Sequence, residues 1–277
     1  MAILWLASFP KSGNTWLRAF LANYLANQSE PIPLETLRSF GYSDAHVWPY
    51  ERIAGKLKAD LNEAEVLRLR PQVHQYFANS RPEHVLVKTH FAMANAGGVD
   101  TITRKVTHGA ICVVRNPWDV AMSYADHYGT SIADAVTALA QPSLTIRAND
   151  TNIRQYLGSW SDHVSSWHSV AWLKRLTIRY EDMISKPTET FAQVVRFMGL
   201  PLDLERLGRA ITFSSFRMLQ EQEVRDGFAE KSQHAERFFR SGQAGGWRRE
   251  MPPDLARKIA RDHAQVLRAL EYAGAEG

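Results

Sequence analysis

The stretch Ile3-Leu4-Trp5-Leu6-Ala7-Ser8-Phe9-Pro10-Lys11-Ser12-Gly13-Asn14-Thr15-Trp16 decides the fold. Its first six residues form a short apolar run that Pro10 and Gly13 close, so the run predicts a buried strand. From Thr15 to Leu25 the apolar residues recur at helical spacing, which predicts a helix. The chain is therefore predicted to begin with a strand, a tight loop and a helix.

The rest of the chain continues this alternation. Strands are predicted at His84–Lys88, Gly109–Val114 and Leu176–Tyr180, and the fully apolar second run is typical of a central parallel strand. Helices are predicted around Asn62–Phe77, from Pro117 onward, and at Arg154–Trp172, Thr188–Met198, Leu204–Thr212 and Pro253–Tyr272. Strands alternating with helices predict an α/β fold with a central parallel sheet flanked by helices.

Length and composition predict one globular domain over residues 1–277. The chain has 45% hydrophobic and 22% charged residues, which excludes a disordered or collagen-like protein. It shows neither an internal repeat nor a clear linker. Residues 129–150 and 221–246 are polar and irregular, as lids and binding loops often are.

The net charge of the chain bears on the class of ligand, and its cysteine content bears on disulfides and on the compartment. Lys plus Arg is 33 and Asp plus Glu is 29, so the net charge is +4. This mild excess suits a small anionic ligand better than a nucleic acid. A single cysteine, Cys112, excludes an internal disulfide and fits a reducing compartment. Neither a transmembrane helix nor a signal peptide is predicted, so we expect a cytoplasmic protein.

The loop Pro10–Trp16 has the features of an anion site. A loop at a helix N-terminus presents free backbone N–H groups and the positive end of the helix dipole. Gly13 lets the backbone approach an anion, Lys11 adds a charge, and Ser12 and Thr15 can donate hydroxyl groups. The alternative is a capped turn with a surface lysine. The loop differs from the ATPase P-loop, in which the lysine follows the glycine.

Two further segments place basic residues at predicted strand ends, where ligands of open α/β sheets bind. Lys88 and His90 are two residues apart at the end of one strand and can point to the same side. Arg115 leaves the next strand, and Ser123 follows inside the helix; an arginine can hold a phosphate through two parallel hydrogen bonds. The alternatives are a hydrogen-bonded structural histidine and a surface arginine paired with Asp119.

A fourth segment, Phe238–Arg249, combines three glycines with three arginines, which suggests a mobile loop that clamps an anion; the alternative is a plain flexible loop. The predicted strand ends carry Lys, His and Arg where a phosphoryl-transfer enzyme normally has a magnesium-binding aspartate. The sequence also lacks a His-Glu-x-x-His pair, so a zinc site is not expected.

In this order and spacing, the four segments resemble the soluble sulfotransferases that use 3′-phosphoadenosine 5′-phosphosulfate (PAPS), and the short N-terminus is more similar to bacterial members. Gly158–Val164 and Arg179–Met183 are similar to family signatures too. The resemblance covers roughly residues 3 to 249. It implies a P-loop-like three-layer fold, PAPS as co-substrate, adenosine 3′,5′-bisphosphate (PAP) as product, and no metal.

The resemblance also implies roles by position. Lys11 would contact the 5′-phosphosulfate and His90 would be the general base, with Lys88 beside it among the catalytic candidates. Trp16 and Phe216 would stack on the adenine, and Tyr180 and Ser214 would lie near it. The other donor-binding candidates are Ser12, Gly13, Asn14 and Thr15 around the 5′-phosphosulfate, and Arg115, Ser123, Arg240, Ser241 and Gly242 around the 3′-phosphate.

The chain departs from the family pattern at three of these places. The usual Arg-Lys-Gly is Arg240-Ser241-Gly242, which removes one positive contact. Asn14 stands where many members have threonine, and Gly246 replaces a frequent aspartate. Residues 29–83 and 129–153 match the animal aryl enzymes poorly, so we expect these insertions to choose the acceptor.

The predicted reaction is an in-line displacement that moves the sulfuryl group to a hydroxyl or amine, with His90 as the base. The acceptor remains open among small alcohols and phenols, sugars, lipid head groups and peptides, and the sequence does not indicate an oligomeric state. The alternatives are a nucleotide-dependent P-loop kinase, which would need Mg²⁺ and ATP, and a binder of nucleotides or anionic polymers that performs no chemistry.

Overall fold

The computed structural model describes residues 1–272, and the chain divides into two compact units. The first unit consists of residues 1–9, 41–112 and 138–175, and the second of residues 10–40, 113–137 and 176 onward. Each unit is assembled from segments far apart in the sequence. The first strand belongs to the first unit, whereas the loop directly after it opens the second.

A five-stranded parallel sheet has the strand order β2-β3-β1-β6-β9. These strands are Tyr42–Ser43, Val85–Thr89, Ile3–Ser8, Thr107–Val114 and Arg175–Arg179, in the same order. Strand β1 is buried along its whole length, as expected where helices cover both faces of a parallel sheet. Leu6 pairs with Lys88 and Ala7 with Thr89, so β1 and β3 end at the same edge. The predicted α/β fold with its central parallel sheet is confirmed.

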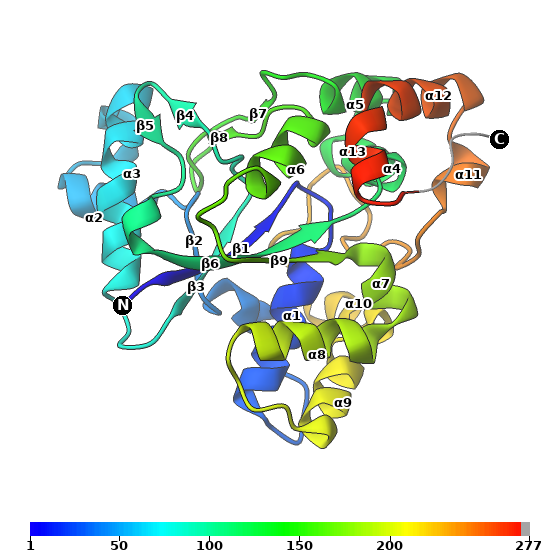
Figure 1. Ribbon diagram of the computed structural model, residues 1–277, viewed down its shortest axis with the longest axis horizontal. Coiled ribbons are helices and arrows are strands. Elements are labelled where there is room, and N and C mark those ends of the chain that lie inside the picture. The colour runs from blue at the N-terminus through cyan, green and yellow to red at the C-terminus, as the bar shows by residue number, and fades with distance from the viewer. Residues whose placement is uncertain (273–277) are drawn as a thin grey trace. The chain divides into compact units, whose positions relative to one another are not determined.

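In the first unit, helix α3 packs beside α2 (Figure 1). Helix α3 starts at a capping box between Asn62 and Glu65, close to the predicted start. Trp5 of β1 and Phe77 of α3 belong to one buried apolar cluster. The unit's helical elements are α2 (Trp48–Ala54), η2 (Lys58–Asp60), α3 (Glu63–Ala78), η3 (Arg104–Val106) and α6 (Trp160–His168). Its small strands are β4 (Asn95–Ala96), β5 (Val99–Asp100), β7 (Thr145–Ile146) and β8 (Gln155–Tyr156).

In the second unit, α1, α8 and α9 pack together (Figure 1). Phe20 of α1 stacks on Phe191 of α8, with ring centroids 4.0 Å apart. Another apolar cluster joins Ala19 of α1, Leu219 of α10 and Phe239 of the following segment. The helices are α1 (Asn14–Ala26), η1 (Leu34–Arg38), α4 (Pro117–Tyr128), α5 (Ile132–Leu139, which crosses the unit boundary), α7 (Tyr180–Ser185), α8 (Pro187–Phe197), α9 (Leu204–Phe213), α10 (Phe216–Asp226), α11 (Trp247–Glu250), α12 (Pro253–Asp262) and α13 (Ala264–Ala269).

The prediction of a helix over Arg154–Trp172 is wrong at its start. Gly158 has φ +68°, a left-handed conformation that interrupts a helix. Ser159 then caps α6 by accepting a hydrogen bond from the backbone N–H of Asp162. The residues before the glycine form β8, which pairs with β7 in an antiparallel hairpin.

Three other stretches also differ from the prediction. The helix predicted over Pro253–Tyr272 is two helices, because His263 has φ −116°, outside the helical range. The stretch 129–150 contains α5, whose first turn is capped by the Ser131 hydroxyl. The stretch 221–246 starts inside α10. Strand β2 was not predicted, because two residues are too few to show a pattern.

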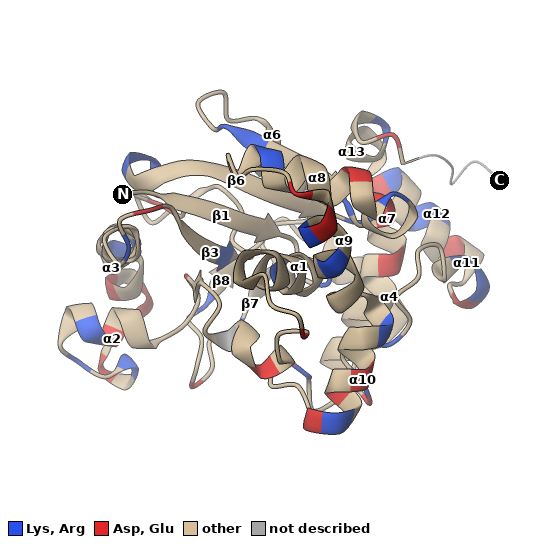
Figure 2. Cartoon of the chain, turned by 90° about the horizontal axis from the view of Figure 1, so that it is seen from below, with Lys and Arg blue, Asp and Glu red and all other residues tan. Residues whose placement is uncertain are grey.

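Charges of both signs lie together on α10 and α11, whereas β1 and β6 carry none (Figure 2). This distribution agrees with the nearly balanced charge of the chain. Among residues 1–272, no helix has the length and apolar character needed to cross a membrane.

Candidate active site

The loop between β1 and α1 turns through two left-handed residues, Lys11 with φ 66° and Gly13 with φ 105°. A Cβ at Gly13 would lie 2.6 Å from Cδ2 of Tyr180, so only glycine fits there. Helix α1 begins at Asn14 without a side-chain cap and without an acidic residue in its first turn. The positive end of the helix dipole therefore has no acidic partner from its own first turn.

Several polar atoms around this loop are buried without a hydrogen-bond partner in the described chain. They are Oγ of Ser12, Nε1 of Trp16, and Nε of Arg18 and of Arg115. Ser12 is 1% exposed and Arg18 is 4% exposed. A buried donor left unpaired is destabilising by about 1–3 kcal/mol, so such a group calls for a partner. An anionic ligand with several oxygen acceptors fits this set of donors.

Lys11 projects among residues of the second unit. Its Nζ lies 3.4 Å from Nδ1 of His127 on α4 and 4.3 Å from the ring centroid of Phe238. Because an ammonium group only donates, Nδ1 of His127 accepts in this contact. The structure thus brings the lysine of the loop to α4 and to the segment that follows α10.

Arg115 ties the loop to the glycine-rich segment. Its Nη1 donates to the carbonyl oxygen of Lys11 at 3.1 Å, and its Nη2 donates to that of Gln243 at 3.3 Å. The guanidinium carbon lies 4.3 Å from the ring centroid of Tyr180. Burial raises the pKa of Tyr180, and the Arg115 charge opposes that rise. Arg115 is therefore fixed by two carbonyls and one aromatic ring.

Aromatic residues line the other side of the loop. Trp16 meets Tyr180 and Phe191 edge to face, with centroids 5.6 and 6.0 Å away. Gly242 has φ +60° and its backbone lies against the ring of Phe216, leaving no room for a Cβ. Ser214 is fully buried where α9 ends, and its hydroxyl donates to the carbonyl of Ala210.

The remaining donor-site candidates are less tightly held. Asn14 is buried in the first turn of α1 and Ser241 is exposed. Ser123 is half-buried in α4, and no hydrogen bond joins it to Arg115 within residues 1–272. Arg240 is 45% exposed and its Nη1 lies 3.6 Å from a carboxylate oxygen of Glu250. The structure thus brings Arg240 to Glu250 and holds the backbone of Gly242 against Phe216.

Asp119 organises the glycine-rich segment, a role that the sequence analysis missed. Its buried carboxylate accepts hydrogen bonds from the backbone N–H groups of Gly245 at 2.6 Å and Trp247 at 3.1 Å. Trp118 is buried and stacks on Trp247, with centroids 5.1 Å apart. The alternative in which Asp119 pairs with Arg115 is therefore wrong. A carboxylate beside a helix start gives no sequence signal for a partner 126 residues away.

In the first unit, His90 follows the end of β3. Lys88 and His90 are half-buried and Thr89 between them is buried, as expected when the first and third residues share a face. Nδ1 of His90 lies 2.7 Å from the carbonyl oxygen of Ser8. Because a carbonyl only accepts, Nδ1 carries the proton and the neutral imidazole has its basic lone pair on Nε2.

The backbone of His90 is held by a second histidine. Nε2 of His163 lies 3.1 Å from the carbonyl oxygen of His90 and therefore donates to it. Burial lowers the pKa of His163 to about 4, so its ring is neutral near pH 7. His163 lies in the signature Gly158–Val164, but that signature did not reveal its partner.

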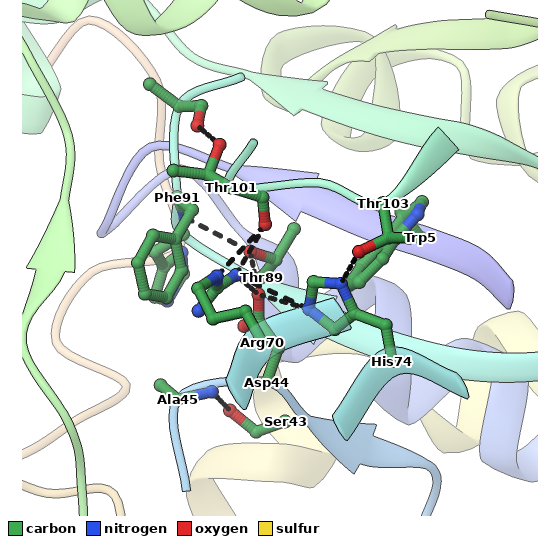
Figure 3. Close-up of polar contacts among 12 residues, drawn as sticks. Trp5, Ser43, Asp44, Ala45, Arg70, His74, Thr89, Phe91, Thr101 and Thr103 are labelled. Atoms are coloured by element: carbon green, nitrogen blue, oxygen red, sulfur yellow. Dashed lines mark hydrogen bonds and ion pairs between the residues drawn. The ribbon is translucent and has the colours of Figure 1, made fainter. Parts of the chain in front are cut away.

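Figure 3 shows a buried polar cluster that includes Thr89, the residue just before His90 in the sequence. Arg70 donates through Nη2 to Asp44 at 2.8 Å and to the carbonyl of Thr101 at 2.6 Å, and both ionic side chains are fully buried. Thr89 donates to the same Asp44 oxygen at 2.9 Å. Burial raises the pKa of Asp44, while the Arg70 charge opposes the rise. This cluster, also missed from the sequence, anchors the residue just before His90.

Known proteins resemble this chain along most of its length. The sulfotransferase domain model matches residues 3–271. Cytosolic sulfotransferase 5 of Arabidopsis thaliana is 22% identical over 268 residues, which cover 92% of this chain and 76% of that protein. Sulfotransferase 1B1 of Canis lupus familiaris is 26% identical over 256 residues, covering 88% of this chain and 76% of that protein.

Two solved structures share the fold. The mouse sulfotransferase SULT7A1 complexed with PAP has a TM-score of 0.63 and 18% identity, covering 98% of this chain and 85% of that one. Retinol dehydratase in complex with androsterone and the inactive cofactor PAP has a TM-score of 0.65 and 17% identity, covering 95% and 80%. Because the domain model spans almost the whole described sequence, the chain belongs to the sulfotransferase family.

Proposed function

We propose that this protein transfers the sulfuryl group of PAPS to a hydroxyl or amine of an acceptor. The observation that carries the proposal is the set of buried, unpartnered donors around the loop after β1. An anion bound there would satisfy those donors and the start of α1 together. Family membership and the PAP held by the structural relatives support PAPS as the donor.

Three groups of residues would bind the donor. Lys11, Ser12, Gly13, Asn14 and Thr15 would hold its 5′-phosphosulfate. Arg115 would hold the 3′-phosphate, with Ser123, Arg240, Ser241 and Gly242. Trp16, Tyr180, Ser214 and Phe216 would surround the adenine. The guanidinium of Arg115 supports this grouping, because it donates hydrogen bonds to the carbonyls of both Lys11 and Gln243. The contact of Trp16 with Tyr180 supports the aromatic group.

The chain's own residues suit the proton and charge changes of the reaction. When bound, the donor supplies an activated sulfuryl group and a phosphate leaving group. His90 would accept the acceptor's proton at Nε2, because its bond to Ser8 fixes the tautomer. Lys11 would stabilise charge that develops on the leaving phosphate. Lys88, which lies on the same face as His90, would add positive charge beside that histidine.

The acceptor is proposed to be a small molecule with a hydroxyl group. Structural relatives are complexed with androsterone and with retinol. We propose that the stretches 29–83 and 129–153 choose among acceptors, since they match the animal aryl enzymes poorly. Two plant relatives are named cytosolic sulfotransferases, which supports the expectation of a cytoplasmic enzyme.

Sulfuryl transfer is tested with labelled PAPS and a panel of alcohols, phenols, sugars, lipids and peptides. Label should pass to one acceptor class without added metal. Phosphate transfer from ATP with Mg²⁺ would instead support the kinase alternative. PAP binding without transfer to any acceptor would support the alternative that the protein binds nucleotides and performs no chemistry.

The roles of His90 and Lys11 are separated by single-turnover rates. His90→Ala should lower the rate about 10²–10⁴-fold and leave PAP affinity within a few-fold. Lys11→Ala should lower it about 10²–10³-fold and also weaken PAPS. The exposed residues His108 and Lys105 provide controls, His108→Ala and Lys105→Ala. A near-normal rate in His90→Ala would remove His90 from the mechanism.

A further inference from the structure

Arg18, in the second turn of α1, forms an ion pair with Glu230. Nη2 of Arg18 lies 2.6 and 2.8 Å from the two carboxylate oxygens of Glu230. The same Nη2 donates to Oγ1 of Thr15 at 3.2 Å, and Thr15 donates to Glu230 at 3.2 Å. The carboxylate therefore receives hydrogen bonds from the first and second turns of α1.

This carboxylate occupies a position suited to a phosphate or sulfate oxygen. Its donors are a guanidinium and a hydroxyl, the groups that bind phosphate in proteins. It lies by the first turn of a helix that has no acidic residue of its own there, so the helix dipole attracts it. Thr15 is one of the residues proposed above to hold the donor's 5′-phosphosulfate.

The two partners differ in burial and in the structure of the segment that carries them. The Arg18 side chain is 5% exposed on a regular helix, and its Nη1 also donates to the carbonyl of Leu37. Its buried Nε has no partner in the described chain. The Glu230 side chain is 25% exposed, on the stretch between α10 and α11 that has no helix or strand. The cation is thus buried on a regular helix, whereas its anion is partly exposed to solvent on an irregular stretch.

We propose that Arg18 is a further residue of the donor site and that Glu230 is a built-in anion that holds Arg18 and Thr15 until the donor's 5′-phosphosulfate replaces it. The proposal rests on the proposed function. A carboxylate and a phosphosulfate repel each other and compete for the same donors. Glu230 therefore lowers donor affinity and keeps a buried cation paired when the donor is not bound.

Titration calorimetry tests this with three nucleotides: PAP, adenosine 5′-monophosphate and adenosine 3′-monophosphate. Glu230→Gln removes the competing charge, so it should lower the dissociation constants of PAP and the 5′-monophosphate about 5- to 10-fold. The dissociation constant of the 3′-monophosphate should not change. Glu236→Gln, an exposed glutamate on the same stretch, is the matched control for loss of one charge.

Arg18→Met should raise the same two dissociation constants about tenfold, and in the double variant Glu230→Gln should no longer improve binding. Arg18→Lys keeps the charge and serves if Arg18→Met does not fold. If the wild-type protein binds PAP normally and Glu230→Gln binds it equally or more weakly, the role proposed for the Arg18–Glu230 pair is overturned. The proposed function is not affected by that result. A wild-type protein that does not prefer PAP to the 5′-monophosphate overturns the proposed function and this inference with it.

Discussion

The two units bury polar side chains in different ways. In the first unit, the guanidinium of Arg70 donates from Nε and both Nη atoms to Thr101, Tyr50 and Asp44. The unpartnered atom of that cluster is an acceptor, Oδ1 of Asp44. In the second unit, the unpartnered atoms near the loop after β1 include the side-chain donors of Ser12, Trp16 and Arg115.

The presence or absence of acceptors inside the protein separates structural from ligand-binding donors. A cluster whose donors all find acceptors inside the protein stabilises the fold without a ligand. A cluster of buried donors that lack acceptors becomes satisfied when an anion arrives. We therefore propose a structural role for the cluster around Arg70 and donor binding for the loop after β1.

The largest expected effect is on the stability of the first unit. Arg70→Met leaves the carboxylate of Asp44 buried without its cation, which should lower the free energy of unfolding by about 3–5 kcal/mol. Urea unfolding measures this, and PAP affinity at a temperature where the variant is folded should be unchanged. The double variant Arg70→Met/Asp44→Asn should recover part of the loss. A loss below about 1 kcal/mol in Arg70→Met would contradict the structural role.

His163 should make stability depend on pH. Its pKa is lowered from 6.5 to about 4 in the folded protein, so the unfolded chain binds the proton more readily between these values. The neutral His163 ring therefore contributes about 3 kcal/mol to the free energy of unfolding above pH 6.5, and this contribution is lost as the pH falls to about 4. His163→Asn should flatten the urea-unfolding profile over this window, although the lowered pKa of His74 leaves a further acid dependence. An unchanged slope would contradict the neutral, buried ring.

Arg115 belongs to the buried donors around the loop after β1, so its loss should weaken nucleotide binding. Arg115→Ala removes a charged donor, so PAP binding should weaken by about 1.5–3 kcal/mol, or roughly 10- to 100-fold. Adenosine 5′-monophosphate lacks the 3′-phosphate, and its affinity should change little. Arg217→Ala, at a side chain that is 89% exposed, is the control for loss of one positive charge. Equal weakening of both nucleotides would place Arg115 away from the 3′-phosphate.

Short-range patterns predicted much of the fold. The apolar run before Pro10, the glycine at residue 13 and Pro117 at a helix start each specify local structure through sterics and periodicity, and all lie where predicted. The error over Arg154–Trp172 arose because helical spacing was extended across Gly158. The hydrogen bond that the Gly245 N–H donates to Asp119 and the ion pair of Asp44 with Arg70 were missed, because tertiary packing joins these residues and leaves no local pattern in the sequence.

We propose that the loop after β1 and Arg115 together bind a 3′-phosphorylated nucleotide. Thermal unfolding with PAP, AMP and ATP at equal concentrations tests this proposal, since a ligand that binds only the folded state raises the melting temperature more when its dissociation constant is lower. We predict a much larger rise with PAP than with AMP or ATP, and a reduced rise in Arg115→Ala. Equal rises with all three nucleotides would contradict the account.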